Sequence, residues 1–211
     1  MTLTRKALAT AALLTLTACD ISHTPTAARA PRDGLLGGLG CAIDGLLGSL
    51  LNFLAPASGA PALVSDTVKF YAVVGQDRHD SLFYRPASGQ SDSVRFVYFD
   101  VPAGALVTDQ HGDTLAAGDS LQITMYLADS AHMVVGFQPS GLKFSTSTPA
   151  SLVMSYHWAN PLSLPMLQSL LGIWYQETPT GNWFCTPSTV QIPAKTVTGQ
   201  VPGFSVYASA Y

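Results

Sequence analysis

The residues whose types and spacing could carry out chemistry begin with a serine, an aspartate and a histidine in mid-chain. Ser120 lies within the sequence Gly-Asp-Ser-Leu at 118–121, and Asp129 precedes His132 by three residues. Such side chains can serve as the nucleophile, the general base and the orienting acid of an acyl-transfer reaction. A serine hydrolase that uses Ser120 is therefore one hypothesis for this chain.

The context of these residues favours a turn instead. The four residues at 118–121 resemble the signature of a family of serine lipases and esterases. That resemblance implies an α/β fold with the serine near the start of the domain and the Asp–His pair near its end. Here the serine and His132 are only twelve residues apart, in a stretch whose alternation predicts strands. We therefore predict that Gly-Asp-Ser begins a strand and that the chain has no catalytic residue.

Metal and cofactor binding is not indicated either. None of the five histidines lies at a metal-ligand spacing from a second histidine or a cysteine. The loop aspartates lack the Asp-x-Asp-x-Asp-Gly pattern of a calcium loop; they stand at positions 77, 80, 109, 113 and 119. No glycine-rich phosphate loop is present. We expect a protein without a cofactor, whose aspartates cap solvated turns.

The first eighteen residues have the layout of a secretory signal peptide. Arg5 and Lys6 precede an apolar run at 7–16 that is too short to span a bilayer. The sequence Leu-Thr-Ala-Cys at 16–19 resembles a bacterial lipobox. That resemblance implies that Cys19 carries a diacylglyceryl group and further acylation, and that the mature chain begins there. We predict an exported protein that a lipid anchors to a membrane of the bacterial cell envelope, on its periplasmic or cell-surface side.

The next two segments connect this lipid to the folded part. Residues 19–34 have little to bury and contain two prolines, which is typical of a flexible tether. Residues 35–61 are rich in glycine and leucine, and their apolar residues at 35, 39, 43, 46, 50 and 54 would form one stripe on a helix. Five glycines weaken such a helix, so we expect it to pack on the main domain or on the bilayer. A transmembrane span is the alternative, which Asp44 disfavours.

Two further cysteines remain, Cys41 and Cys185. Exported chains meet an oxidising compartment, in which these two thiols can form a disulfide. Such a bond would attach the glycine-rich segment to the folded part. Two free or buried thiols are the alternative.

Composition favours a turn-rich β protein for the remainder. The 211 residues are 47% hydrophobic and only 11% charged, and they include 18 glycines and 14 prolines. That apolar content excludes a disordered chain. The net charge of -3 argues against nucleic acid as a partner, because phosphate contacts need excess Lys and Arg.

Residues 62–211 show the short alternating runs of an antiparallel β-sandwich, which makes the chain all-β. In the clearest run, at 121–127, four apolar residues alternate with three polar ones. Further strands are expected at 94–101, 132–137, 152–158, 173–176 and 204–210. One short helix is predicted within 162–171.

Two stretches of this part resemble the ZU-five domain, the β-sandwich module of ankyrins, netrin receptors and many bacterial surface proteins. They are Val-Pro-Ala-Gly-Ala-Leu at 101–106 and Phe-Gln-Pro-Ser-Gly-Leu-Lys-Phe at 137–144. Read physically, the first is a corner at which Leu106 re-enters the core, and the second is a turn between two core anchors, Phe137 and Phe144. Some relatives of the module cleave themselves at His-Phe-Ser. This chain has Gly-Phe-Ser at 203–205, so we expect an intact chain.

That last strand is expected to turn Phe204 inward and to present Ser205, Tyr207 and Ser209 to solvent. The function expected from these observations is the display of a non-catalytic β-sandwich at a membrane surface, for adhesion, assembly or ligand binding. Its partners would be the membrane, through the lipid, and an unknown protein or envelope ligand. An exported hydrolase that uses Ser120 and a purely structural envelope component are the alternatives.

Overall fold

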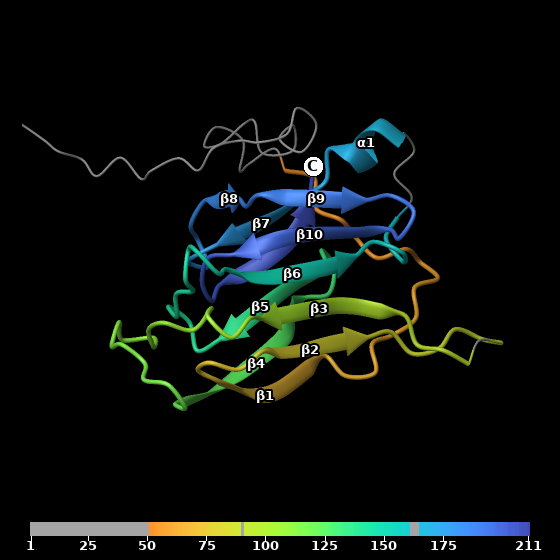
Figure 1. Cartoon of the computed structure of the whole chain (residues 1–211). Coiled ribbons are helices and arrows are strands. Elements are labelled where there is room, and N and C mark those ends of the chain that lie inside the picture. Colours follow the sequence, from red (N-terminus) through yellow and green to blue (C-terminus); the bar gives the residue numbers. More distant parts are fainter. Residues whose placement is uncertain (1–50, 90, 161–164) are drawn as a thin grey trace, which may run out of the picture. The chain divides into compact units, whose positions relative to one another are not determined.

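Two antiparallel sheets stacked face to face form the computed structural model, which describes residues 51–89, 91–160 and 165–211 (Figure 1). The predicted fold class, an all-β antiparallel sandwich, is confirmed for this part of the chain. The signal peptide, the tether and residues 35–50 of the glycine- and leucine-rich segment lie outside the described residues.

One sheet has six strands, in the order β1-β4-β5-β11-β7-β8. Their bounds are Thr67–Val73 (β1), Ser120–Asp129 (β4), Val134–Gln138 (β5), Val206–Ala210 (β11), Gly172–Gln176 (β7) and Trp183–Cys185 (β8). The other has five, in the order β2-β3-β6-β10-β9. Their bounds are Arg78–Phe83 (β2), Arg95–Val101 (β3), Ala150–Ser155 (β6), Thr196–Val201 (β10) and Ser188–Gln191 (β9). A single short helix among the described residues, α1 (Pro165–Ser169), precedes β7.

The core between the sheets is built around an aromatic cluster to which both sheets contribute. The ring of Phe99 on β3 lies 4.6 Å from that of Phe137 on β5, and Phe137 stacks on Phe204 at 5.4 Å. Phe144 meets Phe204 edge-on. Burial of each such ring contributes about 1.5–3 kcal/mol to folding. Leu106, Phe137 and Phe144 are buried, so the predicted corner and its core anchors are confirmed.

The last strand differs from expectation. Tyr207 and Ser209 on β11 are buried instead of exposed, and Tyr207 lies edge-on to the Phe137 ring inside the core. The prediction that they face solvent was wrong because the side of β11 that carries Tyr207 and Ser209 faces the five-stranded sheet. Ser209 pairs with Ile173, whose Cβ would lie 2.6 Å from a Cβ added to Gly199 on β10, so this side of β11 points into the sandwich.

The described end of the glycine- and leucine-rich segment is extended, not helical. Leu54 N donates to Ser209 O, and Asn52 and Tyr211 exchange two backbone hydrogen bonds of 3.0 and 3.2 Å. These residues occupy the place beside the end of β11 that β5 leaves empty, because β5 pairs only with the first two residues of β11. Backbone pairing outweighs the helical spacing of the leucines here, and Leu54 becomes part of the core.

Candidate functional site: a groove at one end of the sandwich

Ser120 does not meet the Asp129–His132 pair. Ser120 begins β4 and Asp129 ends it, so nine residues at about 3.3 Å each place them on the order of 30 Å apart. Asp129 and His132 do pair, with 2.8 Å between Oδ2 and Nδ1. This hydrogen bond, together with one from the Ala131 amide, holds the pKa of Asp129 below its ordinary value. No nucleophile–base–acid triad is assembled from Ser120, His132 and Asp129.

The loop aspartates accept hydrogen bonds from turn amides. Asp109 Oδ1 accepts from the backbone of His111 and Asp113, and Asp77 Oδ1 accepts from Ala103 at 2.7 Å. Within the described ranges, no three His, Cys, Asp or Glu side chains are grouped as metal ligands. The carboxylates therefore hold turns in this part of the chain.

The predicted lipidation and disulfide sites lie mostly beyond the described residues. Cys19 and Cys41 are outside them, so acylation and the pairing with Cys185 stay predictions. Cys185 is half-buried at the end of β8, where its Sγ lies 3.5 Å from the carbonyl oxygen of Thr186. Ser205, the residue matched to the self-cleavage motif, donates its hydroxyl hydrogen bond to the carbonyl of Gln176.

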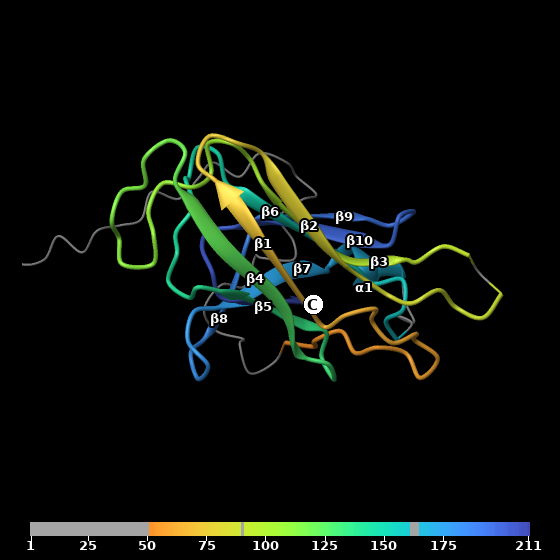
Figure 2. The same ribbon diagram turned by 90° about the horizontal axis from the view of Figure 1, so that it is seen from below.

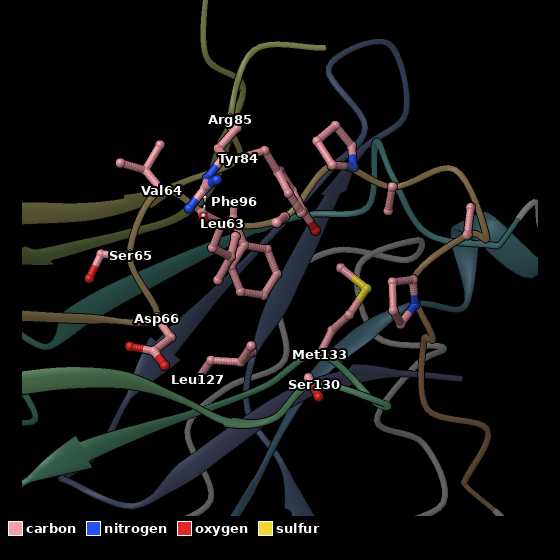
Figure 3. A pocket seen from close by; sticks show the side chains of 15 residues that line it. Leu63, Val64, Ser65, Asp66, Tyr84, Arg85, Phe96, Leu127, Ser130 and Met133 are labelled. Atoms are coloured by element: carbon pink, nitrogen blue, oxygen red, sulfur yellow. Dashed lines mark hydrogen bonds between the residues drawn. The ribbon is translucent and has the colours of Figure 1, made fainter. Parts of the chain in front are cut away.

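A groove of about 690 Å³ opens where the two sheets separate at one end of the sandwich (Figure 3). One wall is the chain that leads into β1, and it includes Pro56, Pro61 and Val64. The opposite wall is the end of β4 and the loop that follows it. Figure 2 shows both segments at the same end of the molecule, with residues 51–63 in orange. Ligand pockets commonly have volumes of about 300–1,000 Å³, so the groove is large enough for a ligand.

The floor of the groove owes its shape to a β-bulge in the five-stranded sheet. Leu82 pairs with Val97 but Phe83 pairs with Arg95, which leaves Phe96 as an extra residue in β3. Phe96 and Val97 are therefore both buried, although successive strand residues normally face opposite sides. Phe96 packs on Tyr84, with 5.3 Å between ring centroids, and both line the groove.

A second bulge shapes the opposite wall. On β4, Leu127 pairs with Val135 and Asp129 pairs with Val134, so one residue of β4 is left over. The loop beyond it carries Met133, whose φ of 52° lies in the left-handed region that side chains seldom adopt. Met133 is buried and lines the groove, and Figure 3 shows its side chain facing Phe96 and Tyr84. Strained backbone and bulges concentrate at functional sites, and here they lie around one cavity.

The rim carries polar groups of both signs. Asp66 and Arg85 are exposed, and Arg85 Nε donates to the carbonyl of Leu63 at 3.3 Å. Val64 stands beside them with 58% of its surface exposed. At the floor, burial raises the pKa of the Tyr84 hydroxyl to about 12. The arrangement offers an apolar floor with one carboxylate and one guanidinium group at its rim.

Comparison with known proteins identifies no relative: no family model, no curated protein and no solved structure matches this chain. The fold and the groove are therefore the basis for assigning a function. No helix in the described part of the chain is long and apolar enough to cross a membrane.

Proposed function

We propose that this protein is an exported, lipid-anchored module that binds a partner in the groove and carries out no reaction there. The observation that carries the proposal is the convergence of two β-bulges, one from each sheet, and of the left-handed Met133 on one apolar cavity. Such irregularities cost stability, and they are retained where they shape a site. The signal peptide and the lipobox ending at Cys19 support the location at the cell envelope.

The lining of the groove favours an uncharged and mainly apolar ligand segment. Leu63, Phe96 and Met133 offer an apolar surface, and opposite charges on Asp66 and Arg85 select neither an anion nor a cation. A short apolar stretch of an envelope protein fits these features, because its side chains match the floor while its backbone can hydrogen bond to the polar rim. Nucleic acid does not match this lining.

The sandwich is proposed to be a ZU-five-like module. The support is the pair of stretches at 101–106 and 137–144, together with an architecture in which both have the expected structural roles. Ala105 N donates to Pro102 O at 2.8 Å in the corner, and Leu106 bridges to Phe144. The two stretches are thus neighbours in space and together close one part of the core.

A disulfide between Cys41 and Cys185 belongs to the same proposal. Its support is the oxidising compartment that export implies and the half-buried position of Cys185 at the edge of the six-stranded sheet.

No specific observation favours either alternative, the exported hydrolase or the purely structural component. The hydrolase hypothesis loses its predicted base, because Asp129 and His132 lie at the other end of β4 from Ser120. An assay on generic esters with Ser120→Ala as the control would test it. A purely structural component would have no use for an open groove.

Binding in the groove is tested with a neutral fluorescent probe, N-phenylnaphthylamine. We expect saturable binding to the full mature protein and its loss in Ser130→Trp, because Ser130 is an exposed groove residue that a larger side chain would extend across the cavity. The matched control is Ser140→Trp, at an exposed turn outside the groove. Equal binding by both variants would place the probe elsewhere.

Anchoring is tested by cell fractionation. Cys19→Ala should move the protein from the membrane to the soluble fraction, because the lipid supplies the attachment. Cys41→Ala is the control and should remain with the membrane. A Cys19→Ala protein that stays membrane-bound would mean that the apolar segment at 35–54 is the true anchor.

A further inference from the structure

A second, smaller hollow lies on the outer face of the five-stranded sheet. Leu82 on β2 is 2% exposed and faces the core, so the next residue, Phe83, faces outward. Arg95 on β3 pairs with Phe83 and therefore shares its outer face. Ser155 on β6 pairs with Thr196 on β10, and together with Arg95 they line a hollow of about 240 Å³. The hollow thus spans three strands of this sheet.

Irregular backbone borders this hollow, as it borders the groove. Phe96, the extra residue of the β-bulge in β3, lines both cavities. Lys195, in the turn before β10, has a φ of 52° in the left-handed region, and its neighbours Ala194 and Thr196 line the hollow. The volume is below the about 300–1,000 Å³ of common ligand pockets, so the hollow suits the end group of a ligand.

The guanidinium group of Arg95 is held in place without a carboxylate partner. Its Cζ lies 4.7 Å from the centroid of the Tyr98 ring and 5.8 Å from that of the Phe83 ring. Contact with ring faces leaves the N–H groups at the guanidinium edge able to donate. None of the ion pairs in the described part of the chain involves Arg95. Asp100, a carboxylate on the same face of β3, lies five residues further along, on the order of 15 Å away.

The other polar groups of the hollow are also able to donate hydrogen bonds. Ser155 is 7% exposed, its Oγ accepts a hydrogen bond from the His157 amide at 3.2 Å, and no described group accepts its hydroxyl hydrogen. The Thr196 hydroxyl and the His157 ring line the hollow as well. No Asp or Glu is among the described residues that line it. A buried donor without an acceptor costs stability, so the hollow favours a ligand that supplies acceptors.

We propose that this hollow binds the C-terminal carboxylate of a short peptide whose last residue is small and apolar. Arg95 can donate two parallel hydrogen bonds to the carboxylate oxygens, and Ser155 on the neighbouring strand can donate a third. Val94, Val153 and Ala194 form the apolar part of the hollow and would contact the last side chain. The site lies on another face than the groove and takes a charged ligand, so it goes beyond the function proposed above.

The test measures binding of dansyl-Ala-Ala to the full chain by fluorescence anisotropy. We expect saturable binding of the peptide with a free C-terminus. The same peptide with a C-terminal amide should bind about tenfold more weakly or worse, because it lacks the charge that the guanidinium recognises. Both peptides carry the same apolar label, so binding of the label in the groove would not distinguish them. Ser130→Trp, which fills the groove, should leave the difference unchanged, so the two sites are tested separately.

Variants of Arg95 and Thr196 assign the binding to the hollow. Arg95→Gln should weaken binding of the acid by about tenfold or more, and Arg95→Lys, which keeps the charge without the planar donor pair, should weaken it severalfold. Thr196→Val removes one hydroxyl without changing the charge and should also weaken it severalfold. The matched control is Lys69→Gln, which removes the same charge from an exposed position on β1 of the other sheet and should leave the affinity unchanged.

Four outcomes would overturn the proposal. Equal affinity for the acid and the amide would show that the carboxylate is not recognised. Full affinity in both Arg95→Gln and Thr196→Val would place the peptide outside the hollow. An equal loss in Arg95→Gln and Lys69→Gln would assign the effect to net charge. Competition by acetyl-Asp-amide, which has only a side-chain carboxylate, that is as strong as competition by acetyl-Ala-Ala would contradict the assignment to a C-terminus.

Discussion

At the scale of single residues, Tyr84 links the groove to a measurable property of the protein. Burial raises the pKa of its hydroxyl from 10.0 to about 12. The folded state therefore holds this proton more tightly than the unfolded state. The resulting stability is fully present below pH 10 and is lost as the pH rises through about 12.

We predict that the free energy of unfolding of the wild type falls more steeply between pH 10 and pH 12 than that of Tyr84→Phe. Phenylalanine keeps the ring on the groove floor and removes the titrating group. Urea unfolding across this range measures the difference, with Tyr71→Phe at an exposed position as the control. Parallel curves for the wild type and Tyr84→Phe would mean that the groove does not shield this hydroxyl from water.

Gly199 permits the close approach of the two sheets. An added Cβ would lie 2.6 Å from Ile173 Cβ and 2.8 Å from Thr186 Oγ1, both of which belong to buried residues. We predict that Gly199→Ala lowers the free energy of unfolding by about 1–3 kcal/mol, as overpacking of a core does. Gly59→Ala is the control, because nothing lies within 4 Å of its added methyl group. Equal stability of the two variants would contradict the packing described.

At the scale of elements, residues 52–54 behave as part of the six-stranded sheet. Leu54 is buried in the core, and its backbone bonds to β11. We predict that Leu54→Ala costs about 2–5 kcal/mol of unfolding free energy, in the range of other buried leucines. Asn52→Ala, at an exposed side chain of the same segment, should cost less than about 0.5 kcal/mol. Similar small losses for both would show that the segment is peripheral to the fold.

How far the sequence predicts an element depends on the element's place in the sheet. The run at 121–127 was predicted because β4 has one face on the core and the other in solvent. The sequence did not predict β2. It is an edge strand, and its residues Arg78, His79 and Asp80 interrupt the alternation of apolar and polar side chains. A helix was predicted within 162–171, and the structure describes the five-residue helix α1 there.

The groove could not be predicted from the sequence for a related reason. A bulge adds one residue to a strand, and neither Phe96 nor the end of β4 shows a sequence signal that distinguishes it from regular alternation. The two walls also lie about sixty residues apart in the sequence, and the pairing of β1 with β4 brings them together. The His132–Asp129 pair, in contrast, is local and could be predicted from its spacing.

At the scale of the whole molecule, the proposed lipid anchor at Cys19 would be connected to a sandwich that has a groove at one end. The chain enters the sandwich beside its C-terminus, where Asn52 and Tyr211 pair, and then passes along the groove as one of its walls (Figures 1 and 2). A partner bound in the groove would therefore contact the segment that leads into β1 as well as both sheets.

Binding in the groove is tested by photo-crosslinking in the cells that produce the full chain. Benzoylphenylalanine replaces Val64 at the groove rim in one protein and Ile192, an exposed apolar residue in the turn between β9 and β10, in the other. We expect a crosslinked partner from position 64 and not from position 192, and we expect the crosslink to be lost when Ser130→Trp fills the groove of the same chain. No crosslink specific to position 64, or one that persists with Ser130→Trp, would contradict binding in the groove.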